Sequence, residues 1–292
     1  MNAKELKLET GHVLQVGEKQ YPEVIEHREA KGKTYQVSPN KFVHLGKHEH
    51  LHYKENGFYH DIDLNDANNI KAPYLLTRTA GIGYKFQARG ENTTEITVKM
   101  LGLPEKLPAP EYRDGGVVYY TDIDTDLDVF TKPLPSRYGL YKVLKSDKAP
   151  RIFQFEIGWS KAPKSVLTAR GAVDAKSLGA ELSRGIEGLL SLYFGESLIP
   201  ACKAWDVNGS PVEVKRSIKG NILTEEVVLP EGFDFYPVTL DVDTELKEES
   251  GTWTAPENVK SPITVESWGG GASGIGGSSS GGGGGGGSYA KK

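Results

Sequence analysis

The sequence predicts a mostly β protein, with one or two antiparallel β-sandwich-like domains and a C-terminal glycine-rich extension. Short alternating runs of apolar and polar residues recur about every ten residues, separated by Gly, Pro and Asn, as in sandwiches and barrels. Aromatic residues are plentiful, with 14 Tyr and 9 Phe against 2 Met, and rings favour pleated strands. Of the 21 residues from Trp268 to Ser288, 13 are glycine, so this end cannot form a core of side chains.

The N-terminal half contains several predicted hairpins. The clearest has strands at residues 48–53 and 58–63, because Asn56-Gly57 between them is the residue pair of a tight hairpin turn. The other strands expected in this half are residues 34–37, 42–45, 74–79, 84–89, 94–101, 117–121 and 127–130.

The C-terminal half continues the pattern, with one interruption. Residues 174–190 place Leu178, Leu182 and Ile186 at helical spacing, although three glycines weaken a helix there. The alternative is a loop followed by a strand at 189–194. The expected strands are 140–144, 152–157, 212–218, 222–228 and 236–242.

Two breaks in composition predict the domain organisation. The proline-containing stretch 132–136 would separate two β domains, although strands could pair across it, and the charged stretch 245–251 has the composition of a linker. The expected parts are an N-terminal arm (1–19), a sandwich-like domain (20–131), a second β-rich domain with the short helix (137–244) and a glycine-rich segment (252–292).

The histidines form the first candidate for chemistry. His48-Glu49-His50-Leu51-His52 matches H-E-x-x-H, but that zinc motif requires a helix, whereas this stretch precedes the Asn56-Gly57 turn with period-two spacing. On a strand, His48, His50 and His52 would share one face, and His60 would come from the partner strand. The alternatives are a strand-borne metal site and a solvated polar face.

The aspartates form the second candidate. Asp122, Asp124, Asp126 and Asp128 alternate, and four carboxylates on one strand face would repel one another unless they were paired or bound to a cation such as calcium. The alternative is a loop in which Asp side chains cap turn amides.

Other functional classes lack support in the sequence. The 35 basic and 39 acidic residues are mixed without a basic block, which argues against nucleic-acid binding. No apolar signal stretch or membrane span is expected, and no nucleophile elbow or phosphate-binding loop occurs. We expect no catalytic residues and no cofactor. Some of six aromatic residues could stack on sugars, but core packing is the stronger expectation: Tyr112, Tyr119, Tyr120, Tyr138, Tyr141 and Trp159.

The C-terminal segment carries the most informative motif. Trp253-Thr254-Ala255-Pro256 leads into an alternating stretch that ends in Trp268-Gly269-Gly270-Gly271, and the glycine tract ends at Tyr289-Ala290. This pattern resembles the glycine-rich domain at the ends of bacteriophage tail fibres and other virion proteins. It stops at Lys292, whereas family members continue into further strands, which leads us to expect a neighbouring chain to complete the domain. A solvated tail is the alternative.

Within the body, residues 52–63, 204–209 and 236–241 are loosely similar to sandwich modules of phage, bacterial surface and toxin proteins.

The resemblance implies a non-enzymatic virion subunit: a tail fibre, a spike or a head decoration. Its implied partners are other virion proteins, further copies of itself, for instance in a trimer, and a host surface glycan or protein. Its interaction residues would be Trp253, Trp268, Gly269, Gly270, Gly271 and Tyr289. The rival classes are a metal-dependent hydrolase that uses the His48–His52 cluster and a bacterial surface or toxin-associated β module.

Overall fold

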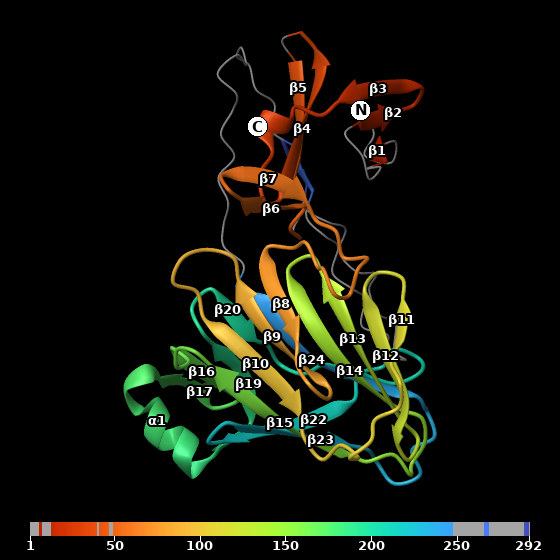
Figure 1. Cartoon of the computed structure of the whole chain (residues 1–292), viewed down its shortest axis with the longest axis vertical. Helices are drawn as coiled ribbons and strands as arrows, with labels where there is room; N and C mark the ends of the chain where they lie inside the picture. The colour runs from red at the N-terminus through yellow and green to blue at the C-terminus, as the bar shows by residue number, and fades with distance from the viewer. Residues whose placement is uncertain are drawn as a thin grey trace. The chain divides into compact units, whose positions relative to one another are not determined.

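The computed structural model describes residues 6–7, 13–39, 41–46, 49–247, 266–268 and 289–291. The chain forms two compact units. The small unit comprises Met1–His27, Thr34–His44 and Gly251–Lys292, and the sandwich unit comprises Arg28–Lys33 and Leu45–Ser250. The predicted fold class is confirmed, because two large antiparallel sheets dominate the described residues (Figure 1).

The small unit consists of short paired strands. Strands β1 (Leu6–Lys7), β2 (Val13–Val16) and β3 (Lys19–Pro22) form an antiparallel sheet. They are followed by the 3-10 helix η2 (Ile25–His27) and by most of the pair β4 (Gly32–Ser38) and β5 (Lys41–Gly46), whose first two and last two residues belong to the sandwich unit. The predicted arm boundary at residue 19 is wrong, because Lys19 pairs with Val16 inside the β2–β3 hairpin.

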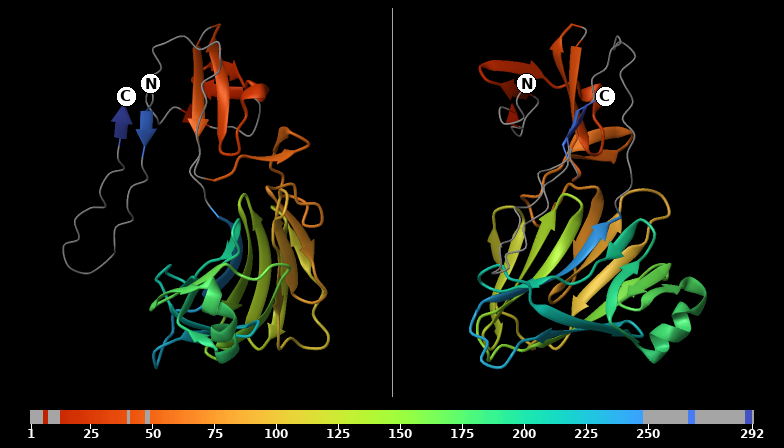
Figure 2. Two further views of the ribbon diagram at one scale, coloured as in Figure 1. Left: turned by 90° about the vertical axis from the view of Figure 1, so that its left-hand side faces the viewer. Right: turned by 180° about the vertical axis from the view of Figure 1, so that it is seen from behind.

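The sandwich unit contains a seven-stranded and a ten-stranded sheet, which Figure 2 shows as two layers. In spatial order the first sheet is β18 (Ile186–Glu187), β22 (Glu213–Lys219), β23 (Ile222–Val228), β15 (Ile152–Trp159), β10 (Glu95–Met100), β9 (Gly83–Ala88) and β8 (Tyr74–Arg78). The second is β11 (Glu111–Arg113), β12 (Val117–Asp124), β13 (Leu127–Leu134), β14 (Arg137–Leu144), β24 (Val238–Leu246), β20 (Ser197–Ile199), β19 (Leu189–Tyr193), β16 (Ser165–Thr168) and β17 (Gly171–Asp174), with β21 (Ala204–Trp205) also paired to β24.

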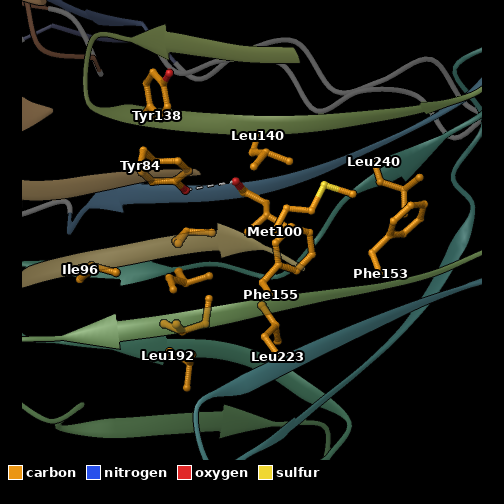
Figure 3. Packing of buried hydrophobic residues seen from close by; sticks show 14 of the residues in the cluster. Tyr84, Ile96, Met100, Tyr138, Leu140, Phe153, Phe155, Leu192, Leu223 and Leu240 are labelled. Carbon is orange, nitrogen blue, oxygen red and sulfur yellow. Dashed lines mark hydrogen bonds between the residues drawn. The ribbon is translucent and has the colours of Figure 1, made fainter. Parts of the chain in front are cut away.

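One hydrophobic core lies between the two sheets. Every second residue of β10 and of β15 is buried, which is the period of a strand with one face on a core. Figure 3 shows Met100, Phe155 and Leu223 of the first sheet packed with Leu140, Leu192 and Leu240 of the second. Tyrosine hydroxyls also join the sheets: Tyr74 donates to the Leu134 carbonyl oxygen at 2.9 Å.

The boundary predicted at residues 132–136 does not divide two domains. Lys132 and Pro133 belong to β13, which pairs with β14 directly across the turn, and Leu134 lies opposite Arg137. Strands from both sides of this turn contribute to both sheets and to the same core. The prolines are tolerated because they sit at the end of a hairpin. Likewise, Glu245 and Leu246 of the predicted linker belong to β24.

The short helix predicted between residues 174 and 190 is present as α1 (Ala175–Arg184). It buries Leu178 and Leu182, one turn apart, and it ends before Gly185. The alternative strand is present as well, since β19 begins at Leu189. Ile186, which fitted the helical spacing, is instead a buried residue of β18.

Candidate functional sites

The predicted hairpin around Asn56-Gly57 forms, but it does not gather the histidines. Strands β6 (His52–Glu55) and β7 (Phe58–Asp61) pair, and Asn56 and Gly57 both have positive φ, as a type I′ turn requires. His52 lies opposite Asp61, whereas His60 lies opposite Tyr53, so the two imidazoles are on opposite faces. His50 precedes the strand, and His48 lies outside the described residues. The strand-borne site with His60 is therefore wrong.

His52 instead takes part in a partly buried polar cluster, in which its own ring is buried and Asp61 is half exposed. Its Nδ1 lies 2.7 Å from the Glu29 carbonyl oxygen and its Nε2 lies 3.5 Å from Asp61. Burial lowers the pKa of His52, and the nearby cations Arg28 and Lys33 lower it further. Burial by itself would raise the pKa of Asp61, but the same two cations outweigh burial and lower that pKa. The cluster attaches segment 28–33 to the β6–β7 hairpin.

The four aspartates do not share a strand face. Asp122 has positive φ at a bulge in β12, and Asp126 has positive φ in the turn before β13. The expectation of period-two alternation is therefore wrong at both positions. Asp124 accepts the Thr125 amide at 2.6 Å, and Asp126 accepts the Ser146 hydroxyl at 2.5 Å. The capping alternative describes these side chains better than a calcium site.

A lysine supplies the positive charge in this loop. Lys145 donates to Asp122 and, at 2.8 Å, to Asp128, which also accepts the Tyr119 hydroxyl at 2.9 Å. Burial opposes the charge on Asp128, but these hydrogen bonds and the Asp122 amide outweigh it and lower the pKa of the Asp128 carboxyl. In the part of the chain that the structure describes, no group of three His, Cys, Asp or Glu side chains is arranged to hold a metal ion.

An ion network that we did not predict crosses the core. Lys142 of β14 donates to Glu225 of β23 at 2.6 Å, and neither side chain is exposed. Arg216 of β22 approaches the other carboxylate oxygen at 3.0 Å and donates to the backbone carbonyls of Leu190 and Pro200. The Lys142 ammonium also lies 4.8 Å from the centre of the Phe155 ring. We call Lys142, Glu225 and Arg216 the core triad; it joins the two sheets.

The signal for the core triad was present in the sequence. Lys142 alternates with Leu140 and Leu144, and Glu225 alternates with Leu223 and Val227, so each charged residue occupies the apolar phase of its strand. Opposite charges in the core phase of two strands indicate a pair across a sandwich.

Two further buried acids, Asp241 and Asp243, lie two residues apart on β24. Asp241 accepts the Lys203 amide at 2.6 Å, and Asp243 lies 3.1 Å from Arg137. The other carboxylate oxygen of Asp243 is buried and has no hydrogen-bond partner among the described residues. Burial raises the pKa of Asp243 to about 7; the neighbouring Asp241 adds to the rise and Arg137 opposes it. A raised pKa in a cleft would indicate an acid catalyst, but the Asp243 side chain is only 2% exposed.

Most of the candidate sugar-stacking aromatics pack against other side chains of the sandwich unit. Tyr120 and Tyr138 are buried in the core. Tyr119, Phe130 and Tyr141 form a row of stacked rings across β12, β13 and β14, with centroids 5.6 and 4.6 Å apart. The ring faces in this row therefore contact one another. Trp159 packs near Phe194, and Tyr112, at 56% exposed, is the most open of the six.

The lone cysteine does not have the environment of a nucleophile. Cys202 is partly buried, in the loop between β20 and β21. Burial raises the pKa of its thiol well above the usual range, so little thiolate forms near neutral pH.

Two of the predicted interaction residues lie in a described strand pair. Strands β25 (Glu266–Trp268) and β26 (Tyr289–Lys291) are antiparallel, and Trp268 pairs with Tyr289. These are the residues that begin and end the glycine tract in the sequence. Trp253, Gly269, Gly270 and Gly271 lie outside the described residues.

Comparison with known proteins gives no relative. No protein-family model, curated protein or solved structure matches the chain. Among the described helices, none is long and apolar enough to cross a membrane.

Proposed function

We propose that this chain is a non-enzymatic structural subunit of a phage particle, such as a tail fibre, a spike or a head decoration. It acts by assembly with other virion proteins and with further copies of itself. Contact with a host surface glycan or protein through the glycine-rich end is part of the proposal.

The observation that carries the proposal is the backbone pairing of Trp268 with Tyr289. These residues bracket the tract on which the resemblance to virion glycine-rich domains rests. A paired strand at each end of a glycine tract favours a built element over a solvated tail, because pairing fixes the tract's two ends against each other.

The sandwich unit supports a structural role in a second way. Its most deeply buried charges pair with one another: Lys142 and Arg216 both lie against Glu225. His52, from the His48–His52 cluster on which the hydrolase alternative rests, lies against the Glu29 carbonyl oxygen and Asp61. These ion pairs and the contacts of His52 join parts of the fold, which suits a rigid assembly component.

The test is to find the chain in particles. Virions assembled from the genome that encodes it should contain the full chain by mass spectrometry, and gold-labelled antibody should mark one structure on each particle. A chain ending at Gly251 should keep the circular dichroism of the sandwich unit but fail to incorporate. Particles that lack the full chain, or that accept the truncated chain equally well, would overturn the proposal.

A further inference from the structure

Arg78, which has no acidic partner among the described residues, lies where edge strands of the two sheets meet. Arg78 is the last residue of β8, the edge strand of the seven-stranded sheet, and Tyr112 is the central residue of β11, the edge strand of the ten-stranded sheet (Figure 1). The Arg78 guanidinium donates to the Tyr112 hydroxyl at 3.1 Å and to the Tyr120 hydroxyl at 2.6 Å. These two bonds fix the guanidinium of β8 against two neighbouring strands, β11 and β12, of the ten-stranded sheet.

The charge of Arg78 is not neutralised within the described part of the chain. Arg113, on the same edge strand as Tyr112, lies 2.7 Å from Glu111, and Arg137 lies 3.1 Å from Asp243, but no described carboxylate lies within 4.0 Å of Arg78. Phenol hydroxyls orient a guanidinium without cancelling its charge. Of its five N–H donors, two are used by the tyrosines, and the others have no acceptor among the described residues. Arg78 is therefore a cation held in a fixed position, and it has N–H donors that no described residue uses.

An exposed ring adjoins this cation. Tyr112 is 56% exposed, and its ring centre lies 5.6 Å from the Arg78 guanidinium carbon. An open tyrosine face offers a surface for the C–H groups of a sugar ring, and its hydroxyl offers a polar contact. A carboxylate matches the fork of a guanidinium through two parallel hydrogen bonds.

We propose that Arg78 and Tyr112 form a binding site for an acidic sugar, with its carboxylate on the guanidinium and its ring on Tyr112. A single cation suits a carboxylate monoanion better than a phosphate dianion, and the chain's net charge of −4 disfavours polyanions held by charge alone. This site goes beyond the proposed function, because it lies on the sandwich unit and is far from the glycine tract in sequence. Whether it binds a sugar can be tested independently of virion assembly.

The experiment is a titration of the full chain followed by NMR of the tyrosine rings and arginine Nε–H groups. The probes are glucuronate, glucose, glucose 6-phosphate and inorganic phosphate; glucuronate and glucose differ only at the carboxylate. Glucuronate should shift the Tyr112 ring and Arg78 Nε–H signals saturably, and glucose should not. Arg78→Lys keeps the charge but loses the fork, and should weaken glucuronate binding about tenfold.

Two variants make the result specific. Arg113→Lys changes an arginine on the neighbouring edge strand that already has Glu111 as its partner, and it should leave binding unchanged. Tyr112→Leu removes an exposed ring, should preserve the fold by circular dichroism, and should also weaken binding. Equal responses to glucuronate and glucose, tighter binding of either phosphate probe, or an unaffected Arg78→Lys variant would each overturn the proposal.

Discussion

At the scale of single residues, Asp243 holds a carboxyl group where its charge is poorly compensated. One oxygen faces Arg137, the other has no hydrogen-bond partner in the part of the chain that the structure describes, and the group is buried. The pKa near 7, against about 3.9 in an unfolded chain, means that the folded protein prefers the neutral acid. The favourable contribution of the neutral Asp243 carboxyl to the free energy of unfolding is fully present below about pH 4, and it is lost as the pH rises to 7.

Asp243→Asn should remove this pH dependence. Between pH 5 and pH 8 the parent should lose about 3 kcal/mol of unfolding free energy relative to the variant. Urea denaturation at several pH values measures the difference. Asp147→Asn, at an exposed position, is the control and should follow the parent. An Asp243→Asn curve parallel to the parent would show that this carboxyl does not titrate in that range.

The core triad gives a second prediction at this scale. Glu225→Gln leaves Lys142 and Arg216 buried beside a neutral amide, and should destabilise the protein by about 3–5 kcal/mol. Glu95→Gln is the control: Glu95 pairs with Lys85 at 2.9 Å, but both side chains are at least 40% exposed, so about 1 kcal/mol or less should be lost. Thermal and urea denaturation compare the two.

A triple replacement separates charge from packing. Lys142→Met, Glu225→Leu and Arg216→Leu together should recover most of the stability that Glu225→Gln loses, because they leave no unpaired buried charge. If Glu225→Gln costs no more than Glu95→Gln, the triad is not a stabilising ion network.

At the scale of elements, short sequence patterns predicted where strands form, but they did not predict which residues and strands those strands would contact. The β6–β7 hairpin was predictable because Asn56-Gly57 determines its own turn. The Asp122–Asp128 stretch was not, because two left-handed residues, Asp122 and Asp126, break an alternation that looks regular in sequence. The sequence of β14 shows that Lys142 occupies a core-facing position. Its partner Glu225 lies on the other sheet, and the pattern of one strand does not identify the strand that faces it.

The turn between β11 and β12 offers a matched pair of glycines. Gly115 and Gly116 have φ of +71° and +68°, but a Cβ on Gly115 would meet nothing within 4 Å, whereas one on Gly116 would lie 2.2 Å from the Leu64 carbonyl oxygen. Gly115→Ala should therefore cost only the left-handed strain, about 1–2 kcal/mol. Gly116→Ala should cost several kcal/mol more, because a backbone oxygen must also move. Urea denaturation of both variants measures these losses of unfolding free energy. Equal losses would show that segment 64–70 moves aside at no energetic cost.

At the scale of the whole molecule, the proline-containing turn at 132–136 shows what composition leaves undecided. Prolines mark the end of a strand equally well in a hairpin and in a linker, and the difference lies in pairing partners far along the chain. Here β14 pairs with β13 on one side and with β24, about a hundred residues later in sequence, on the other. Both sheets contain strands from before and after the turn, and their strands belong to one compact unit.

That unity predicts the behaviour of fragments. Fragments 20–131 and 137–244, cut at the expected boundary, should each lack a native near-ultraviolet circular dichroism spectrum, because each would expose half of the shared core. The full chain should lose the signals of the two sheets in one transition, measured by hydrogen exchange at β10 and β14. The uncut chain with the single substitution Pro135→Gly is the control. It should remain folded, because the hairpin needs a connection at this point but does not need proline. Independent folding of either fragment would show that the sandwich consists of two domains after all.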